Sequence, residues 1–178
     1  MNFEKAEKLA QEAGFDSVAY LDCETIELLE EVRGMCAMNT CGMYGKNQAC
    51  PPSCGTLEEC RKRIGQFHWG ILIQTVGEIE DSFDFEGMQQ AEKLHKKQFL
   101  ALADKLRSFC PDLLPLGSGC CTVCKSCVGP DAPCRFPQKR MSSLEAYGIL
   151  VSDLCSKNHL KYHYGPEHIA YTALFLLG

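Results

Sequence analysis

Four closely spaced cysteines constrain this chain more than any other feature of its sequence. Cys121, Cys124, Cys127 and Cys134 form a C-x2-C-x2-C-x6-C array within the segment 117–137. Gaps of two residues let successive thiolates point inward from one tight loop, and a more distant cysteine can then complete a tetrahedral ligand set. The array therefore predicts a metal site with sulfur ligands.

The spacing of this array favours an iron–sulfur cluster. It resembles the cysteine run of bacterial ferredoxins, in which three close cysteines bind one cubane cluster and a fourth, followed by proline, binds another. Here Arg135 stands in the proline position after a gap of six residues, so Cys134 can belong to a different metal from its neighbours. Structural zinc is the alternative, although zinc sites usually pair two C-x2-4-C knuckles.

A second cysteine-rich segment lies earlier in the chain. It contains four cysteines, Cys36, Cys41, Cys50 and Cys54. The segment is rich in Gly, Pro and Asn, and an irregular loop of about twenty residues is usually functional. Glycines permit the backbone dihedrals with which a chain wraps a cluster, and free N–H groups can donate to sulfur. We predict a second metal site here, with Cys155 as an alternative fourth ligand.

Composition and charge limit the classes of function. The 178 residues, 46% hydrophobic and 23% charged, predict a single cysteine-rich metal-binding domain over 1–178. A formal net charge of −5 argues against a nucleic-acid partner. The longest apolar run, 169–177, is too short to span a membrane, and residues 1–13 lack a signal-peptide pattern. We therefore expect a cytoplasmic protein with no membrane partner, in which clustered cysteines bind metal or catalyse rather than form disulfides.

Hydrophobic periodicity predicts an α+β fold with α/β-like character: a mixed β-sheet packed with helices, two cysteine-rich metal-binding loops and a C-terminal β-hairpin. The run 69–76 is apolar on both faces at its centre, which predicts a central strand. We expect His95 on the polar face of a helix. Further strands are predicted at 15–21, 113–116, 160–164 and 168–177, and helices at 3–13, 24–33, from 56, at 88–109 and at 142–157.

Four motifs together carry a resemblance to a known family. They are C-G-M-Y-G-K-N-Q-A-C-P-P-S-C-G-T-L-E-E-C, G-S-G-C-C-T-V-C-K-S-C, P-D-A-P-C-R-F-P and S-S-L-E-A-Y-G-I-L-V-S-D-L-C. From about Gly34 to its C-terminus the chain resembles the DUF2284 family of predicted metal-binding proteins. The resemblance implies a cysteine-rich metal-binding protein of anaerobic bacteria or archaea. Some relatives have Cys in place of Tyr147, which makes Cys54 or Cys155 the candidate to complete the first site, while Cys120 is an extra thiol, either bystander or alternative ligand.

The lead hypothesis is a protein with two [4Fe–4S] clusters, one at each cysteine region. It would transfer electrons to a redox partner protein or enzyme, or act as an accessory redox protein in anaerobic metabolism. The sequence contains no nucleophile–base pair, Rossmann glycine motif or zincin signature, and so no catalytic motif beyond the ligand cysteines. Two alternatives stay open: a zinc-binding structural or interaction module without redox activity, and an enzyme with an open iron–sulfur site in which Cys54 is not a ligand.

Overall fold

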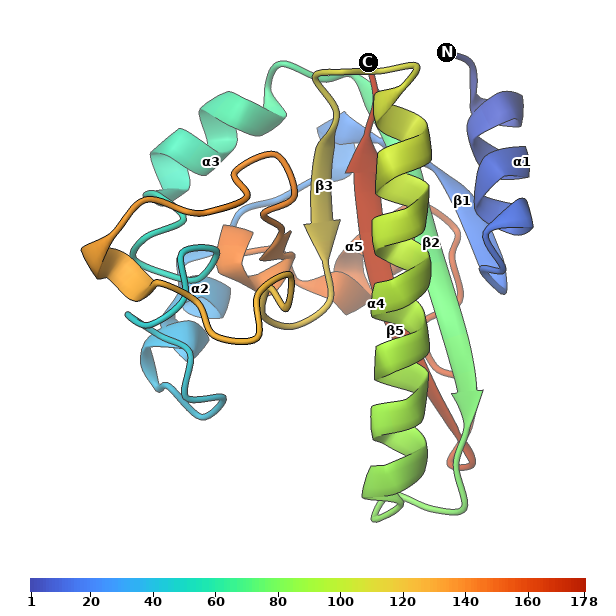
Figure 1. The fold of residues 1–178 in the computed structure, drawn as a ribbon. Coiled ribbons are helices and arrows are strands. Elements are labelled where there is room, and N and C mark those ends of the chain that lie inside the picture. Colours follow the sequence, from blue (N-terminus) through green and yellow to red (C-terminus); the bar gives the residue numbers. More distant parts are fainter.

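A mixed five-stranded sheet lies at the centre of the computed structural model, which describes residues 1–178 (Figure 1). The strand order is β1-β2-β5-β3-β4, and only β3 and β4 run parallel to each other. Because β5 pairs with β2 on one side and β3 on the other, the last strand of the chain lies in the middle of the sheet. The strands are β1 (Ser17–Asp22), β2 (Trp69–Glu78), β3 (Leu114–Gly117), β4 (Ser142–Ser143) and β5 (His168–Leu176).

Five α-helices cover the sheet and its surroundings. They are α1 (Phe3–Glu12), α2 (Glu30–Ala37), α3 (Leu57–Ile64), α4 (Phe85–Arg107) and α5 (Val151–Lys157), with short 3-10 turns at Cys23–Thr25, Gly129–Asp131 and Glu145–Tyr147. Thr56 begins α3 with a complete capping box to Glu59, as the sequence predicts. None of the helices is both long enough and apolar enough to cross a bilayer.

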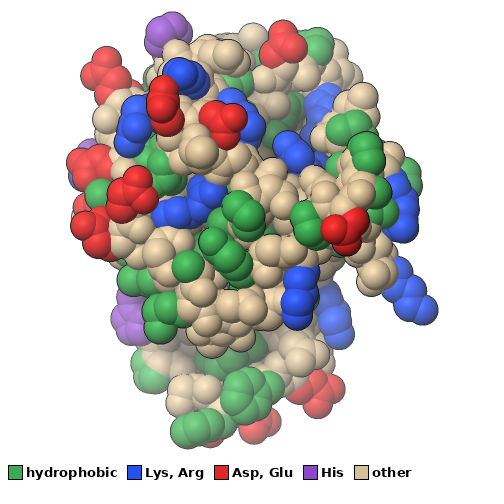
Figure 2. Space-filling model, turned by 90° about the vertical axis from the view of Figure 1, so that its left-hand side faces the viewer, with side chains coloured by type: hydrophobic (Ala, Val, Ile, Leu, Met, Phe, Trp, Pro, Cys, Tyr) green, Lys and Arg blue, Asp and Glu red, His purple; other side chains and the backbone are tan.

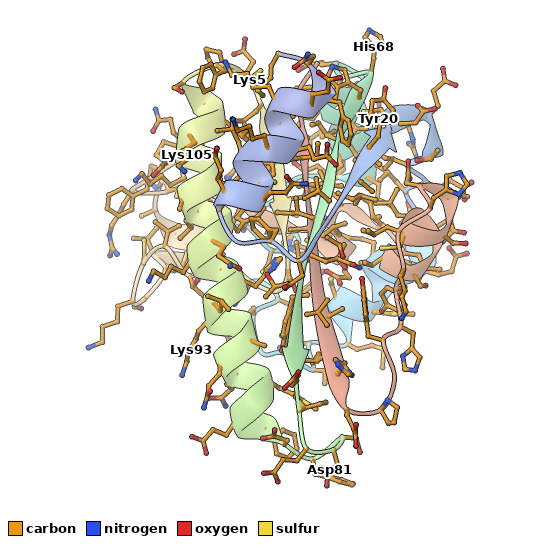
Figure 3. The ribbon with its side chains drawn as sticks, turned by 90° about the vertical axis from the view of Figure 1, so that its right-hand side faces the viewer. Lys5, Tyr20, His68, Asp81, Lys93 and Lys105 are labelled. Atoms are coloured by element: carbon orange, nitrogen blue, oxygen red, sulfur yellow. The ribbon has the colours of Figure 1, made fainter.

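The two faces of the sheet bury separate hydrophobic cores. Successive side chains of a strand point to opposite faces, so Ile71 and Ile73 of β2 join one core while Leu72 joins the other. α1 and α4 lie side by side over the first face (Figure 3). The second core also includes residues of β1, β3 and β5, the turn at Cys23, α3, α5 and the segment 144–149. The predicted α+β class and the central position of β2 are both confirmed.

The predicted C-terminal hairpin is wrong in its first strand. Residues 160–164 form no strand, and only β5 joins the sheet. Both edges of β5 are occupied, by β2 and by β3, so no edge remains for a hairpin partner. Tyr164 instead places its side-chain hydroxyl 2.8 Å from Oε1 of Gln74, to which it donates, and 3.2 Å from the hydroxyl of Ser17.

The predicted helix over 142–157 is also wrong in its first half. Residues 142–143 form β4, and a helix appears only from Val151. The cause is Gly148, which has a left-handed φ of 78° and whose carbonyl accepts a hydrogen bond from the N–H of Leu29 at 2.8 Å. This hydrogen bond to a distant segment, together with the left-handed backbone, turns the chain at Gly148. Local capping alone predicts a continuous helix there. The helix predicted at 24–33 likewise begins later, at Glu30.

The two cysteine loops lie together beyond the β3 side of the sheet. Figure 1 shows residues 38–56 (teal) and 118–141 (orange) next to each other, away from α1. The core positions this pair of loops through α2, α3 and β3, the elements from which the loops begin or into which they lead. The sheet is thus a support, and the loops form the face on which chemistry can occur.

Candidate metal centre

The first cysteine cavity has a volume of about 360 Å³ and lies beside the end of α2. Cys36 comes from the last turn of that helix, and Cys41 and Cys50 come from the loop that follows. The fourth cysteine of the wall is Cys120, which follows β3. Other residues of the wall are Met43, Tyr44, Glu92, Ser143 and Glu145.

The two predicted candidates for a fourth ligand, Cys54 and Cys155, are not part of this wall. Cys54 is 1% exposed, and its thiol lies 3.7 Å from the carbonyl oxygen of Ala146. Cys155 is fully buried in the core, 4.0 Å from Nε2 of Gln74. The structure therefore brings three of the four predicted residues together and adds Cys120. Ligation by any of them stays a prediction.

The sequence contained one signal that could have assigned Cys120 to the first site. Consecutive side chains leave the backbone in different directions, so Cys120 and Cys121 are poorly placed to serve the same small site. A Cys-Cys pair at the start of an array is therefore suited to two sites. The structure has this arrangement, with Cys120 in the first cavity and Cys121 in the second.

The second cavity brings together all four cysteines of the predicted array. It is a narrow space of about 20 Å³. The other residues of its wall include Asn47 and Gln48 from the first loop and Phe136 and Arg140 from the second. Its four cysteines are Cys121, Cys124, Cys127 and Cys134.

The first loop is joined to the second through a short buried turn. Asn47, 4% exposed, donates from Nδ2 to the carbonyl oxygen of Cys121 at 3.1 Å. The backbone N–H of Gln48 donates to the sulfur of Cys127 at 3.4 Å, and its side chain donates to the carbonyl oxygens of Gly129 and Ala132. Each loop therefore builds part of the other loop's site, and the two sites form one unit.

Two arginines anchor the first loop to the rest of the protein. Arg33 donates to the carbonyl oxygen of Ala146 at 2.6 Å and to that of Gly55 at 2.5 Å. Arg63 donates to the carbonyl oxygen of Cys54 at 2.8 Å. Hydrogen bonds from charged donors are stronger than neutral ones, so these contacts hold the end of the loop against the wall of the first cavity.

The thiols of the first site are difficult to ionise without a cation. Burial, with smaller effects of the neighbouring thiols Cys120 and Cys41, raises the pKa of Cys50 to about 12. Burial also raises the pKa of Cys36 and of Cys120. A metal must be bound by thiolates, so its binding would displace protons from this group of mutually repelling sulfurs.

The second site has the opposite electrostatic character at Cys127. Burial alone would raise the pKa of this thiol, but the backbone N–H groups of Gln48, Gly129 and Val128 and the charge of Arg135 lower it overall. N–H donors and a nearby cation favour a thiolate. The Cys127 thiol is therefore easier to ionise than an isolated thiol, which favours the binding of a metal.

The donor set indicates which metals suit these cavities. An all-cysteine wall suits soft thiolate-binding centres, namely zinc, copper(I) or iron–sulfur clusters. All thirteen cysteines are free thiols. No three His, Cys, Asp or Glu side chains converge closely enough to hold a single metal ion. The thiols thus line shared spaces without surrounding one point.

The two sites are neighbours on one face of the molecule. Another cavity of about 360 Å³ has Cys120, Cys121, Cys124 and Cys127 in its wall and shares Met43 with the first cavity. Figure 2 views the molecule from the side of the cysteine loops, with Lys and Arg side chains (blue) dispersed among side chains of the hydrophobic group (green), in which Cys is included. Cys41 is exposed there, so the first site reaches the surface.

Comparison with known proteins supports this assignment of the region to metal binding. A family model described as a predicted metal-binding protein, DUF2284, matches residues 19–177. No curated protein and no solved structure matches the chain. The match includes both cysteine loops and every strand of the sheet except the first residues of β1. The chain therefore belongs to the DUF2284 family of predicted metal-binding proteins.

Proposed function

We propose that this protein binds two [4Fe–4S] clusters and transfers single electrons to a partner protein or enzyme, as an accessory redox protein of anaerobic metabolism in the cytoplasm. The observation that carries the proposal is the division of eight cysteines into two groups of four that meet at consecutive residues. The first group is Cys36, Cys41, Cys50 and Cys120, and the second is Cys121, Cys124, Cys127 and Cys134.

The volume of the first cavity supports a cluster over a single zinc ion at that site. A tetrahedral zinc ion with Zn–S distances of about 2.3 Å holds its sulfurs about 3.8 Å apart. A cubane cluster binds each cysteine through a different iron, so its thiolates stand farther apart. A cavity of about 360 Å³ with four cysteines in its wall suits the larger group.

Charged and hydrogen-bonding groups of the chain act on the cysteine sulfurs of both sites. The N–H of Gln48 and the guanidinium of Arg135 stabilise negative charge at Cys127. Glu145 opposes negative charge at Cys36. Hydrogen bonds to sulfur and local charge set reduction potentials, so we expect the second site to accept an electron more readily than the first.

The link between the sites supports movement of an electron from one to the other. Consecutive Cα atoms lie about 3.8 Å apart, so Cys120 and Cys121 hold the two groups within one peptide unit of each other. The bound clusters would supply the one-electron chemistry. Around the first site, Met35 and Met38 are 62% and 75% exposed, and exposed apolar side chains of this kind are suited to contact with a partner protein.

An enzyme with an open iron–sulfur site is the second candidate. The observation in its favour is the size of the first cavity and the presence of Tyr44, Ser143 and Glu145 in its wall. If Cys120 is not a ligand, one iron of the cluster has a free coordination position. The three side chains would then face a substrate bound at that iron. A zinc-binding structural module without redox activity is the alternative that the same thiols permit.

The deciding experiment is anaerobic purification followed by iron, sulfide and zinc analysis and a visible spectrum. Two cubane clusters predict about eight irons and eight sulfides per chain, with a broad visible absorption that bleaches on reduction. One or two zinc ions in a colourless protein would overturn the electron-transfer proposal. About eight irons with a spectrum that changes on addition of small molecules would favour the open-site enzyme.

A further inference from the structure

Another cavity, with no cysteine in its wall, is lined by residues of α3, the end of α4 and β3. Its volume is about 270 Å³. Three arginines from distant parts of the chain line it: Arg63 of α3, Arg107 at the end of α4, and Arg140 at the end of the second cysteine loop. No aspartate or glutamate is part of its wall.

The positive charge around this cavity is incompletely balanced by the protein. Neither Arg63 nor Arg140 takes part in any ion pair of the structure. Arg107 has a carboxylate partner, Asp104, at 3.3 Å, which it shares with Lys139. Like charges that surround one hollow repel each other, so an anion in the cavity would relieve a repulsion that the fold otherwise retains.

The neutral polar groups of the wall are also suited to an acceptor ligand. The buried hydroxyl of Tyr147 accepts a hydrogen bond from Arg63 at 3.1 Å, and its own proton has no acceptor in the structure. Ser142 is 8% exposed and lines the same space. A hydroxyl has one donor in addition to its lone pairs, so Tyr147 and the guanidinium groups all have donors available for one ligand.

Apolar residues also line the cavity. Leu114, Pro111 and Pro137 are among them, and these side chains offer no charge or donor to a ligand. A cavity that combines a few polar donors with apolar lining residues is typical of a site for small organic molecules. Guanidinium groups bind the planar or branched oxygens of carboxylates and phosphates with particular strength.

We propose that this cavity binds a small organic anion, a carboxylate or phosphate monoester, with its charged group on Arg63, Arg107, Arg140 and Tyr147 and its carbon body against the proline and leucine side chains of the wall. The proposal does not depend on the identity of the metal. It does connect the two regions, because Arg140 lines both this cavity and the second cysteine cavity. An anion bound here would lie next to the second metal site and reduce the positive charge beside it.

Calorimetric titration of the full, metal-loaded chain with phenyl phosphate, benzoate and inorganic phosphate tests the proposal. We expect saturable one-site binding of phenyl phosphate or benzoate, tighter than inorganic phosphate because only the organic probes contact the apolar residues of the wall. Preference between the two organic probes distinguishes a phosphate ligand from a carboxylate ligand. Absence of saturable binding with all three probes would overturn the proposal.

Two variants and a matched control locate the binding. Arg140→Gln removes a cation whose side chain donates no hydrogen bond in the structure, and Arg107→Gln removes one that lines neither cysteine cavity, so at least one should fold with unchanged metal content. Each should weaken binding about tenfold or more, as expected for a charge-assisted contact. Arg61→Gln makes the same change in charge on α3 but outside the cavity, at an exposed side chain that makes no ion pair. An equal loss in Arg61→Gln would show non-specific attraction and overturn the site.

Discussion

The backbone N–H of Gln48 donates a hydrogen bond to the sulfur of Cys127, which lies 79 residues farther along the chain. The side chain of the same residue donates to the carbonyl oxygens of Gly129 and Ala132. One residue of the first loop thus supports both the electrostatics and the shape of the second. This contact is the reason to regard the two cysteine sites as one unit.

Replacement of Gln48 with Ala should loosen the second loop without removal of the donor to Cys127. The substitution deletes the side-chain hydrogen bonds and retains the backbone N–H, so we expect a destabilisation of about 1 kcal/mol and faster amide hydrogen exchange over residues 128–134. Gln11→Ala, at an exposed position of α1, is the control and should change neither quantity. Unchanged exchange in Gln48→Ala would contradict the structural role of this side chain.

Replacement of Cys120 with Ser should impair the first metal site, whereas replacement of Cys54 should not. Cys120 lines the first cavity and Cys54 lies outside it, so we expect Cys120→Ser to lose up to about four irons per chain under cubane ligation. Iron and sulfide analysis after anaerobic purification measures the difference. Cys155→Ser is a second control and should retain its iron. Loss of iron in Cys54→Ser with full retention in Cys120→Ser would show that the fourth ligand is wrongly assigned.

His95 should make the protein less stable in acid. The sequence predicts an exposed residue, but His95 is 1% exposed, with Nδ1 2.9 Å from the hydroxyl of Thr75 and no partner for Nε2. Burial, with a smaller effect of Lys96, lowers its pKa from 6.5 to about 4. The unfolded chain therefore takes up a proton at higher pH than the folded chain does. The stabilisation is complete above pH 6.5 and is lost as the pH falls towards 4.

The size of this effect is measurable by denaturant unfolding at two pH values. Between pH 7 and pH 5 we expect His95 to account for a loss of about 2 kcal/mol in the free energy of unfolding. His95→Leu should lose correspondingly less free energy of unfolding between pH 7 and pH 5. The comparison is of this difference, because the stability of the variant at pH 7 can itself differ from that of the wild type. His163→Gln, at an exposed position, should retain the wild-type dependence. Parallel pH profiles for wild type and His95→Leu would contradict a buried neutral histidine.

Substitution of Gly148 with Ala should damage the fold near the first site. A Cβ at this position would lie 2.8 Å from the carbonyl oxygen of Leu29, and its φ of 78° is in the left-handed region. We expect a loss of about 2 kcal/mol or more, seen as a lower Tm, together with reduced metal content. Gly165→Ala is the matched control, because its φ is 105° but no atom lies within 4 Å of the added Cβ. Equal effects of the two substitutions would show that backbone conformation alone matters at Gly148.

Much of the architecture was predictable because it depends on local patterns. The capping box at Thr56, the apolar run of β2 and the long amphipathic α4 are each written in adjacent residues, and all three appear in the structure. The two cysteine regions were predictable for the same reason. Gly148 shows where such patterns fail, since its carbonyl accepts a hydrogen bond from the N–H of Leu29, which lies in a distant segment of the chain.

The sequence by itself determined the α+β class, the thiol-rich chemistry and the spacing of the array from Cys121 to Cys134. Only the tertiary structure decided that Cys120 joins the first site while Cys54 turns towards Ala146, that β5 takes the place of a hairpin, and that His95 is buried. It also brought Arg63, Arg107 and Arg140 around one cavity. The physical reason is the same throughout: the direction of a side chain from a loop or the end of a helix depends on the distant segments packed against it, and no local spacing contains that information.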